Sequence, residues 1–102
     1  MEIIAKLSDM IEEEMEDAEK YIRCALEKKE DNPSLASTFY TLSLEEMKHM
    51  NMLHDQVTMI IKNYRETKGE PPEHMKALYD ILHKKHIAKA TAIAGMQALY
   101  KS

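Results

Sequence analysis

The chain has 102 residues, with 14 Lys and Arg against 18 Asp and Glu and a formal net charge of −4 at pH 7. This length accommodates one domain, and a mildly acidic chain without a basic cluster is not typical of nucleic-acid-binding proteins. Only 2 Gly and 3 Pro interrupt apolar residues that are mostly Met, Leu, Ile and Ala, a composition typical of helices. We therefore predict a single all-α domain over residues 1–102.

The start of the chain and its uncharged runs bear on its location. Met1 and Glu2 are not followed by a basic region and a long apolar segment, so no signal peptide is expected. The uncharged runs are far shorter than the roughly 18–20 residues that a membrane span requires. The single Cys24 cannot close an internal disulfide and fits a reducing compartment. We expect a cytoplasmic protein without a membrane segment.

Two breaks divide the chain into three helices. The stretch "EDNPSL" offers Asp31 or Asn32 as a helix N-cap ahead of Pro33. The stretch "TKGEPPEH" offers Gly69 as the end of one helix and two prolines as the start of the next. At about 1.5 Å per residue the helices are about 40–50 Å long, which suits an antiparallel bundle. The predicted helices cover about residues 2–29, 33–66 and 72–100.

The first predicted helix carries an apolar stripe that contains a glutamate. Spacings that alternate between three and four residues keep these side chains on one helix face. Burying an ionised carboxylate without a partner costs several kcal/mol, so Glu14 in this stripe calls for compensation. The predicted stripe consists of Ile4, Leu7, Ile11, Glu14, Ala18, Tyr21 and Ala25.

The second predicted helix repeats the pattern with a glutamate and a histidine in its stripe. This stripe consists of Phe39, Leu42, Glu46, His49, Leu53, Gln56 and Ile60. A neighbouring row makes the apolar surface broad enough to face two other helices. That row consists of Met47, Met50, His54, Val57, Ile61 and Tyr64, in which we interpret His54 as a histidine at the core edge or surface.

The third predicted helix is amphipathic, and its polar interruptions include no glutamate. Its stripe consists of Met75, Leu78, Leu82, His86, Ala90, Ile93, Gln97 and Tyr100. The segment "YDILHKKH" places Asp80 and His83, and likewise His83 and His86, three residues apart, so each pair points toward the same axial level. Metal contact by these three residues stays open, although solvated or capping roles are the more ordinary interpretation.

The spacing of Glu46 and His49 indicates half of a metal-binding shell. Residues at i and i+3 on a helix point toward the same axial level. Oxygen donors mixed with imidazole suit iron or manganese, and zinc stays open. Antiparallel packing can bring Glu14 to the same depth, with Glu13, Glu16 and Glu19 competing for that role if the register differs. The predicted metal ligands are Glu14, Glu46 and His49.

The ligand set within one chain is incomplete. A di-iron carboxylate site takes a Glu from each of two helices and a Glu-x-x-His from each of two others. This chain offers one of each, so two copies related by a twofold axis supply all six ligands. We therefore expect a homodimer at least, with the site formed between two subunits.

The segments "EEEMEDAEKYIRCAL" and "FYTLSLEEMKHMNMLHDQV" together resemble the first helical hairpin of rubrerythrins and other ferritin-like proteins. In that family a ligand Glu precedes a Tyr by seven residues, as Glu14 precedes Tyr21, and "EEMKH" carries the family's Glu-x-x-His. The resemblance spans about residues 8–60. The plan is similar to that of the short encapsulated ferritins, whose di-iron site forms only between subunits. It implies a four-helix bundle completed by dimerisation, two Fe per dimer, and ferroxidase-type oxidation of Fe(II) by O2 or peroxide.

Two departures from that family keep other functions open. The chain has neither a second ligand-bearing hairpin nor a Cys-x-x-Cys pair, so the electron entry used by rubrerythrin peroxidases is missing. One alternative is a non-catalytic helical oligomer in which Glu14, Glu46 and His49 form a hydrogen-bonded polar layer. Another is a metal sensor or scavenger without turnover. No catalytic residue beyond the metal ligands is predicted.

Overall fold

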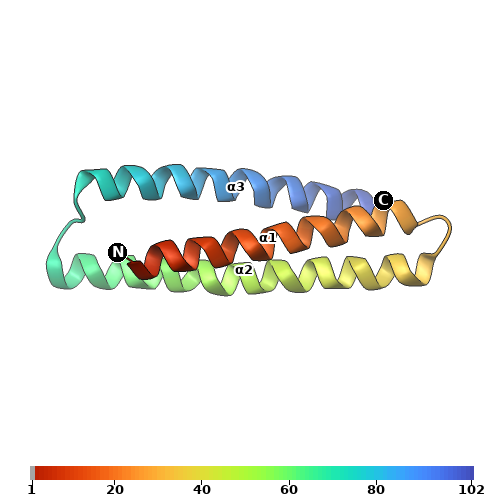
Figure 1. Cartoon of the computed structure of the whole chain (residues 1–102), viewed down its shortest axis with the longest axis horizontal. Helices are drawn as coiled ribbons and strands as arrows, with labels where there is room; N and C mark the ends of the chain where they lie inside the picture. Colours follow the sequence, from red (N-terminus) through yellow and green to blue (C-terminus); the bar gives the residue numbers. More distant parts are fainter. Residues whose placement is uncertain (1) are drawn as a thin grey trace.

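The computed structural model describes residues 2–102 as three long helices and no strands. Successive helices run antiparallel, and the molecule is a rod with extents of 56 × 19 × 18 Å (Figure 1). The prediction of an all-α chain with three helices is confirmed, and each helix begins and ends within two residues of its predicted range. Within the described part of the chain, no helix is both long and apolar enough to cross a membrane. The helices are α1 (Glu2–Lys28), α2 (Pro33–Lys68) and α3 (Glu73–Lys101).

Local sequence signals set the two connections. Of the two N-cap candidates, Asn32 serves α2: its side-chain oxygen accepts a hydrogen bond from the Leu35 N–H at 3.3 Å, directly before Pro33. Gly69 ends α2 with φ of 80°, a conformation that other residues rarely adopt, and donates its N–H to the Arg65 carbonyl. These short connections force consecutive helices to lie side by side and antiparallel.

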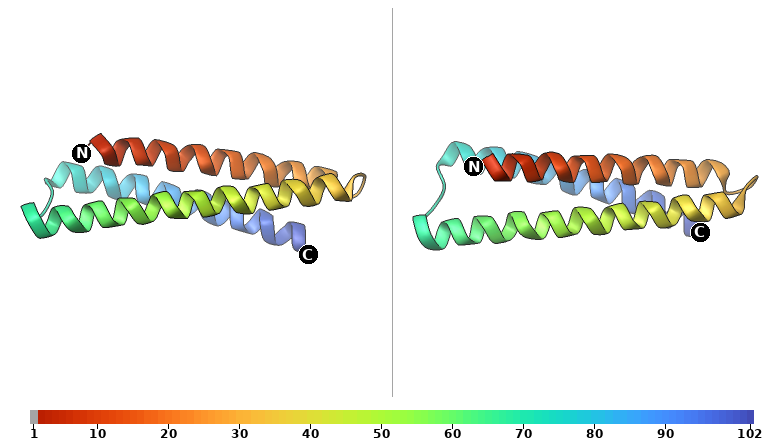
Figure 2. Two further views of the ribbon diagram at one scale, coloured as in Figure 1. Left: turned by 90° about the horizontal axis from the view of Figure 1, so that it is seen from below. Right: turned by 60° about the horizontal axis from the view of Figure 1, so that its bottom comes forward.

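The helices pack unequally around the core. The hairpin of α1 and α2 is in contact along most of its length, whereas α3 lies mainly against α1 and touches α2 less (Figures 1 and 2). The radius of gyration is 16.4 Å, against about 13 Å for a compact domain of this length. Such a rod buries comparatively little apolar surface. The buried core consists of Ile11, Met15, Ala18, Met50, Val57 and Ile93.

The buried faces match the predicted stripes in part. On α1, Ile11, Ala18 and Ala25 of the predicted stripe are buried, but so are Met15 and Ile22, while Glu14 and Tyr21 lie at the edge of the buried face. The reason is that α1 contacts both α2 and α3, so its buried face turns toward α3. On α2 no residue of the predicted stripe is fully buried: Met50 and Val57 belong to the predicted neighbouring row, and Ala36 and Ser43 continue that row at intervals of seven residues. On α3 the predicted stripe holds at His86 and Ile93, whereas Leu78 is exposed.

One buried hydroxyl joins all three helices. Ser43 of α2 donates a hydrogen bond to the Ala18 carbonyl of α1 at 2.8 Å and accepts one from the Gln97 side chain of α3 at 3.0 Å. Ala18 is one turn beyond Glu14, and Ser43 is one turn before Glu46. Because a buried polar group must be satisfied, sliding α1 along α2 would break this bond. The bond therefore holds the register that places the two glutamates side by side.

Candidate metal centre

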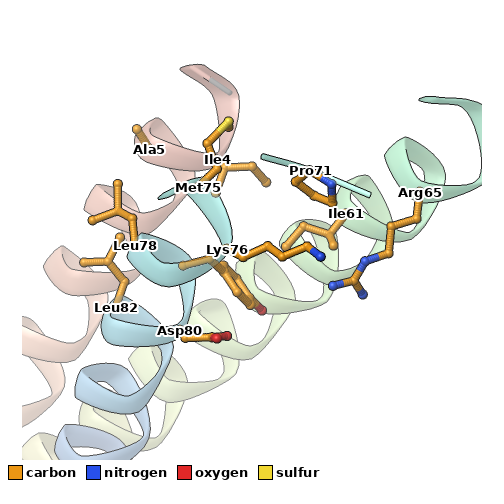
Figure 3. Close-up of a pocket in the computed structure, with 11 residues that line it drawn as sticks. Ile4, Ala5, Ile61, Arg65, Pro71, Met75, Lys76, Leu78, Asp80 and Leu82 are labelled. Carbon is orange, nitrogen blue, oxygen red and sulfur yellow. The ribbon is translucent and has the colours of Figure 1, made fainter. Parts of the chain in front are cut away.

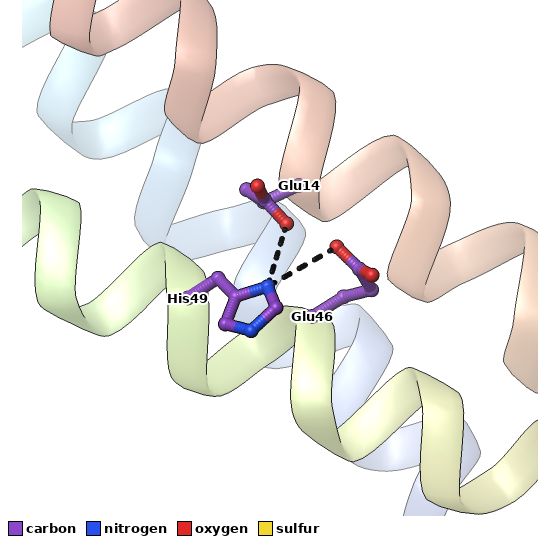
Figure 4. A group of neighbouring side chains, drawn as sticks. All are labelled: Glu14, Glu46 and His49. Carbon is purple, nitrogen blue, oxygen red and sulfur yellow. Dashed lines mark ion pairs between the residues drawn. The ribbon is translucent and has the colours of Figure 1, made fainter.

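Glu14, Glu46 and His49 converge between α1 and α2. His49 Nδ1 lies 3.4 Å from Glu14 Oε2 and 3.7 Å from Glu46 Oε2 (Figure 4). One potential ligand atom from each of the three side chains falls within 4.8 Å of the other two. Among residues 2–102, this is the only group of three or more His, Cys, Asp or Glu side chains that meets this condition. The structure thus brings together all three residues predicted as ligands.

The competing acidic residues of α1 point elsewhere. Glu13 and Glu16 are exposed, and Glu19 forms an ion pair with Arg23 at 3.1 Å. Glu14 and Glu46 are largely shielded, with side chains 26% and 19% exposed, whereas the His49 side chain is 55% exposed. Glu14 Oε2 is buried and has no hydrogen-bond partner. A buried acceptor without a partner is costly, so a cation beside it would remove an existing penalty.

The two glutamates perturb one another. The pKa of Glu46 is raised from 4.5 to about 7, first by hydrogen bonding with the Glu14 carboxyl, then by burial and by repulsion from the Glu14 charge. His49 opposes this shift, and Asp17 adds slightly to it. A proton held between two carboxyls is what a metal ion replaces when it binds, because ligand carboxylates must be ionised.

Donor geometry supports a metal here without help from similarity to a known protein. No family model, curated protein or solved structure matches this chain. An ion bound at about 2.1 Å separates its ligand atoms by about 3.4 Å in a tetrahedral arrangement and by about 3.0 Å when they are adjacent in an octahedral one. The 3.4 and 3.7 Å separations at His49 lie within a few tenths of an ångström of the tetrahedral value, and a small contraction would reach the octahedral one. Two carboxylates and one imidazole therefore fit a divalent cation such as iron or manganese.

The three side chains lie on the side of the hairpin away from α3. Figure 4 shows them in front of α1 and α2, with α3 behind. Glu12, two residues before Glu14, instead faces α3, where it lies 3.4 Å from Lys85 and 3.6 Å from His86. Two residues correspond to about 200° around a helix, so Glu12 and Glu14 leave α1 on nearly opposite sides. The cluster consequently opens onto the face of the hairpin that α3 leaves uncovered.

Sequence patterns missed the contacts of the remaining histidines. His54 Nε2 of α2 lies 3.4 Å from His83 Nδ1 of α3, and both side chains are partly buried. His86 is buried against Glu12, and burial lowers its pKa while Glu12 acts in the opposite direction. Asp80 is exposed. The solvated or capping roles expected for this segment of α3 therefore do not describe His83 or His86, whose partners lie on other helices.

A cavity of about 200 Å³ lies where α1 begins, α2 ends and α3 begins (Figure 3). Its walls are mostly apolar, with Arg65 and Lys76 at the polar part of the lining. Both cations pair with Glu70, at 3.5 and 2.9 Å, and hydrogen bonding to Lys76 lowers the pKa of Glu70. Ile4 in this cavity is ten residues, or about 15 Å, from Glu14 along α1. The cavity is therefore separate from the glutamate–histidine cluster.

The Glu46 pKa predicts how the stability of the metal-free protein depends on pH. A pKa raised above the unfolded value means that folding favours the protonated form, so this contribution is complete below about pH 4.5 and is lost as pH rises through about 7. The glutamine of Glu46→Gln is uncharged at every pH, so this variant does not lose stability in that way as pH rises. In urea unfolding with a chelator present, the stability of Glu46→Gln relative to the natural chain should therefore increase from about pH 5 to about pH 8. A difference that stays constant across this range contradicts the assignment.

Proposed function

We propose that the chain is a ferritin-like di-metal protein that binds two Fe(II) ions between two subunits and oxidises them. The observation that supports this most is the convergence of Glu14, Glu46 and His49, in which the buried Glu14 Oε2 accepts no hydrogen bond and lies 3.4 Å from His49 Nδ1. One chain contributes a single Glu and a single Glu-x-x-His pair, which is half of a di-iron carboxylate set. Two chains related by a twofold axis complete it.

The uncovered face of the hairpin has the composition that such a dimer requires. Residues 4, 7 or 11 positions from Glu14 or Glu46 share the helix face of that glutamate. Four of these positions, Ala18, Ala25, Met50 and Val57, are buried in the core. The other eight hold apolar or aromatic side chains, of which Ile3, Met10 and Leu35 are exposed in the single chain. Pairing two such faces would bury them around the glutamates and complete a four-helix bundle. These eight residues, which we call the hairpin face, are Ile3, Leu7, Met10 and Tyr21 of α1 and Leu35, Phe39, Leu42 and Leu53 of α2.

Each residue of the site has a distinct role in this proposal. Glu46 has the least exposed side chain of the three, which suits the carboxylate that both ions would share. His49 presents Nδ1 to the glutamates and serves as a terminal ligand. Glu14 closes the opposite side from α1. When Glu46 ionises on binding, its proton passes to solvent through the exposed His49 side of the site.

The substrate supplies the redox chemistry. Two Fe(II) ions bound side by side give up two electrons, which reduce O2 to peroxide or peroxide to water with protons taken from solvent. The chain's contribution is to hold both ions at one place with ionised carboxylates, which stabilise Fe(III) more than Fe(II) because they offset its higher charge. The apolar hairpin face would surround the ions and restrict water.

Anaerobic titration of the metal-free protein with Fe(II), combined with the mass in solution, tests this proposal. We expect saturation at two ions per two chains, a loaded species of about twice 11.8 kDa, and Fe(III) absorbance after air is admitted. Saturation by a species of single-chain mass would contradict the shared site. Lack of any Fe(II) binding would favour the alternative in which the three side chains form a metal-free polar layer holding a proton.

A further inference from the structure

The histidine pair between α2 and α3 is independent of the glutamate–histidine cluster. His54 follows His49 by five residues, so the two side chains leave α2 about 140° apart. His49 faces the uncovered side of the hairpin, and His54 faces α3. His54 and His83 are 29 residues apart in the chain and meet only because α2 and α3 lie antiparallel.

We propose that His54 and His83 form a second metal site, which takes a divalent ion of the zinc type. His54 Nε2 and His83 Nδ1 form a long hydrogen bond, and their separation of 3.4 Å exceeds the roughly 2.7–3.2 Å usual for an N–H donor. The same separation matches that of two nitrogen ligands around a tetrahedral zinc ion, which is about 3.3–3.4 Å for Zn–N bonds of about 2.0–2.1 Å. A zinc ion would therefore take the place of the proton that the two nitrogens share.

The surroundings of the pair hold both rings near this position. The His83 ring lies nearly parallel to those of His54, at a centroid distance of 5.2 Å, and Tyr79, at 5.5 Å. The two imidazole planes differ by 22° and their nitrogens face each other, so a ring must rotate about its Cβ–Cγ bond before both nitrogens point at one ion. His86, one turn further along α3, faces Glu12 instead. Among residues 2–102, no third His, Cys, Asp or Glu joins the pair.

The donor sets of the two sites favour different ions. The glutamate–histidine cluster offers mostly oxygen, whereas the second site offers only imidazole nitrogen, which suits zinc, copper or nickel better than manganese. A metal held by His54 and His83 would also join α3 to α2, which are the two helices with the least mutual contact. Binding to the folded chain alone raises its stability, so the ion should act as a clamp on α3.

Zinc titration of a Glu14→Gln/Glu46→Gln double variant tests this inference without interference from the first site, because only His49 of that site then remains as a donor. We expect one Zn²⁺ per chain and a melting temperature that rises with Zn²⁺. Adding His54→Gln or His83→Gln should weaken Zn²⁺ binding at least about tenfold, the loss that even outer-shell partners cause, and remove the rise in melting temperature. His74→Gln is the matched control, because His74 is an exposed histidine of the same helix and should leave both unchanged.

Imidazole NMR of the Glu14→Gln/Glu46→Gln chain gives a second readout that needs no histidine variant. Zn²⁺ should shift the signals of two of the five histidines, those of His54 and His83. The inference is overturned if this double variant binds no Zn²⁺, if adding His54→Gln or His83→Gln leaves Zn²⁺ binding as tight as in their parent, or if Zn²⁺ shifts other histidines instead. Failure of Fe(II) binding in the natural chain would leave this result unaffected, because the two sites share no residue.

Discussion

Replacing Glu46 by glutamine should abolish Fe(II) binding and its oxidation in air. Glu46 has the least exposed carboxylate of the cluster and lies 3.7 Å from His49 Nδ1, and in the dimer it would be lost from both halves of the site. Glutamine has nearly the same shape but offers no negative charge to a cation. Because loss of an outer-shell partner alone costs about 10–100-fold in metal affinity, loss of two shared ligands should cost at least about 100-fold. Anaerobic Fe(II) titration followed by air measures both effects.

Glu45→Gln is the matched control for this experiment. Glu45 is the adjacent residue on the same helix, is exposed, and lies outside the cluster, so this variant should bind Fe(II) as the natural chain does. Unfolding cannot explain a loss in Glu46→Gln, since removing a carboxyl with a raised pKa should stabilise the metal-free chain near neutral pH. Equal Fe(II) binding by the two variants would rule out Glu46 as a ligand.

Replacing Ile3 by glutamate should separate the proposed dimer. The iron site should be lost with it, although Ile3 lies away from the glutamate–histidine cluster. Ile3 is 46% exposed in the single chain and precedes Glu14 by eleven residues, which places it on the hairpin face about 16 Å from the cluster. A dimer would bury two copies of the new carboxylate, at several kcal/mol each. We expect the dimer dissociation constant to rise at least about 100-fold. Sedimentation and Fe(II) capacity, measured on the same samples, should fall together.

Ile87→Glu provides the comparison, because it makes the same change on α3. Ile87 is 52% exposed, and α3 lies on the opposite side of the hairpin from the cluster. Glutamate in the first turn of α1 suits the helix dipole, so Ile3→Glu should not weaken the fold of the single chain. If Ile3→Glu remains a dimer or binds Fe(II) fully as a single chain, the hairpin face is not where the second subunit binds.

Features that depend on neighbouring residues could be predicted from the sequence. Asn32 with Pro33 and Gly69 act within one helical turn, so the ends of the helices follow from hydrogen bonds and φ preferences close by in the chain. The pairing of Glu46 with His49 is of the same kind, because helix geometry alone brings residues at i and i+3 together. For this reason half of the candidate site was predictable without knowing how the helices pack.

The other half depended on how α1 lies against α2. Sequence spacing alone left Glu13, Glu16 and Glu19 as competitors of Glu14. The structure selects Glu14 because α1 packs through Met15 and Ile22, and because the bond from Ser43 to the Ala18 carbonyl fixes the register. Nothing in the sequence marks Ser43 as the residue that joins three helices. Its importance comes from burial, which only the packed structure determines.

The sequence by itself determined three helices, their ends and a Glu-x-x-His pair on one of them. Only the tertiary structure decided that Glu14 completes the cluster, that the cluster faces away from α3, and that His54 meets His83. The physical reason is the range of the interactions. Helix ends and i, i+3 neighbours are set by contacts within a few residues, whereas rotation and register between helices are set by the summed packing of many side chains far apart in the chain.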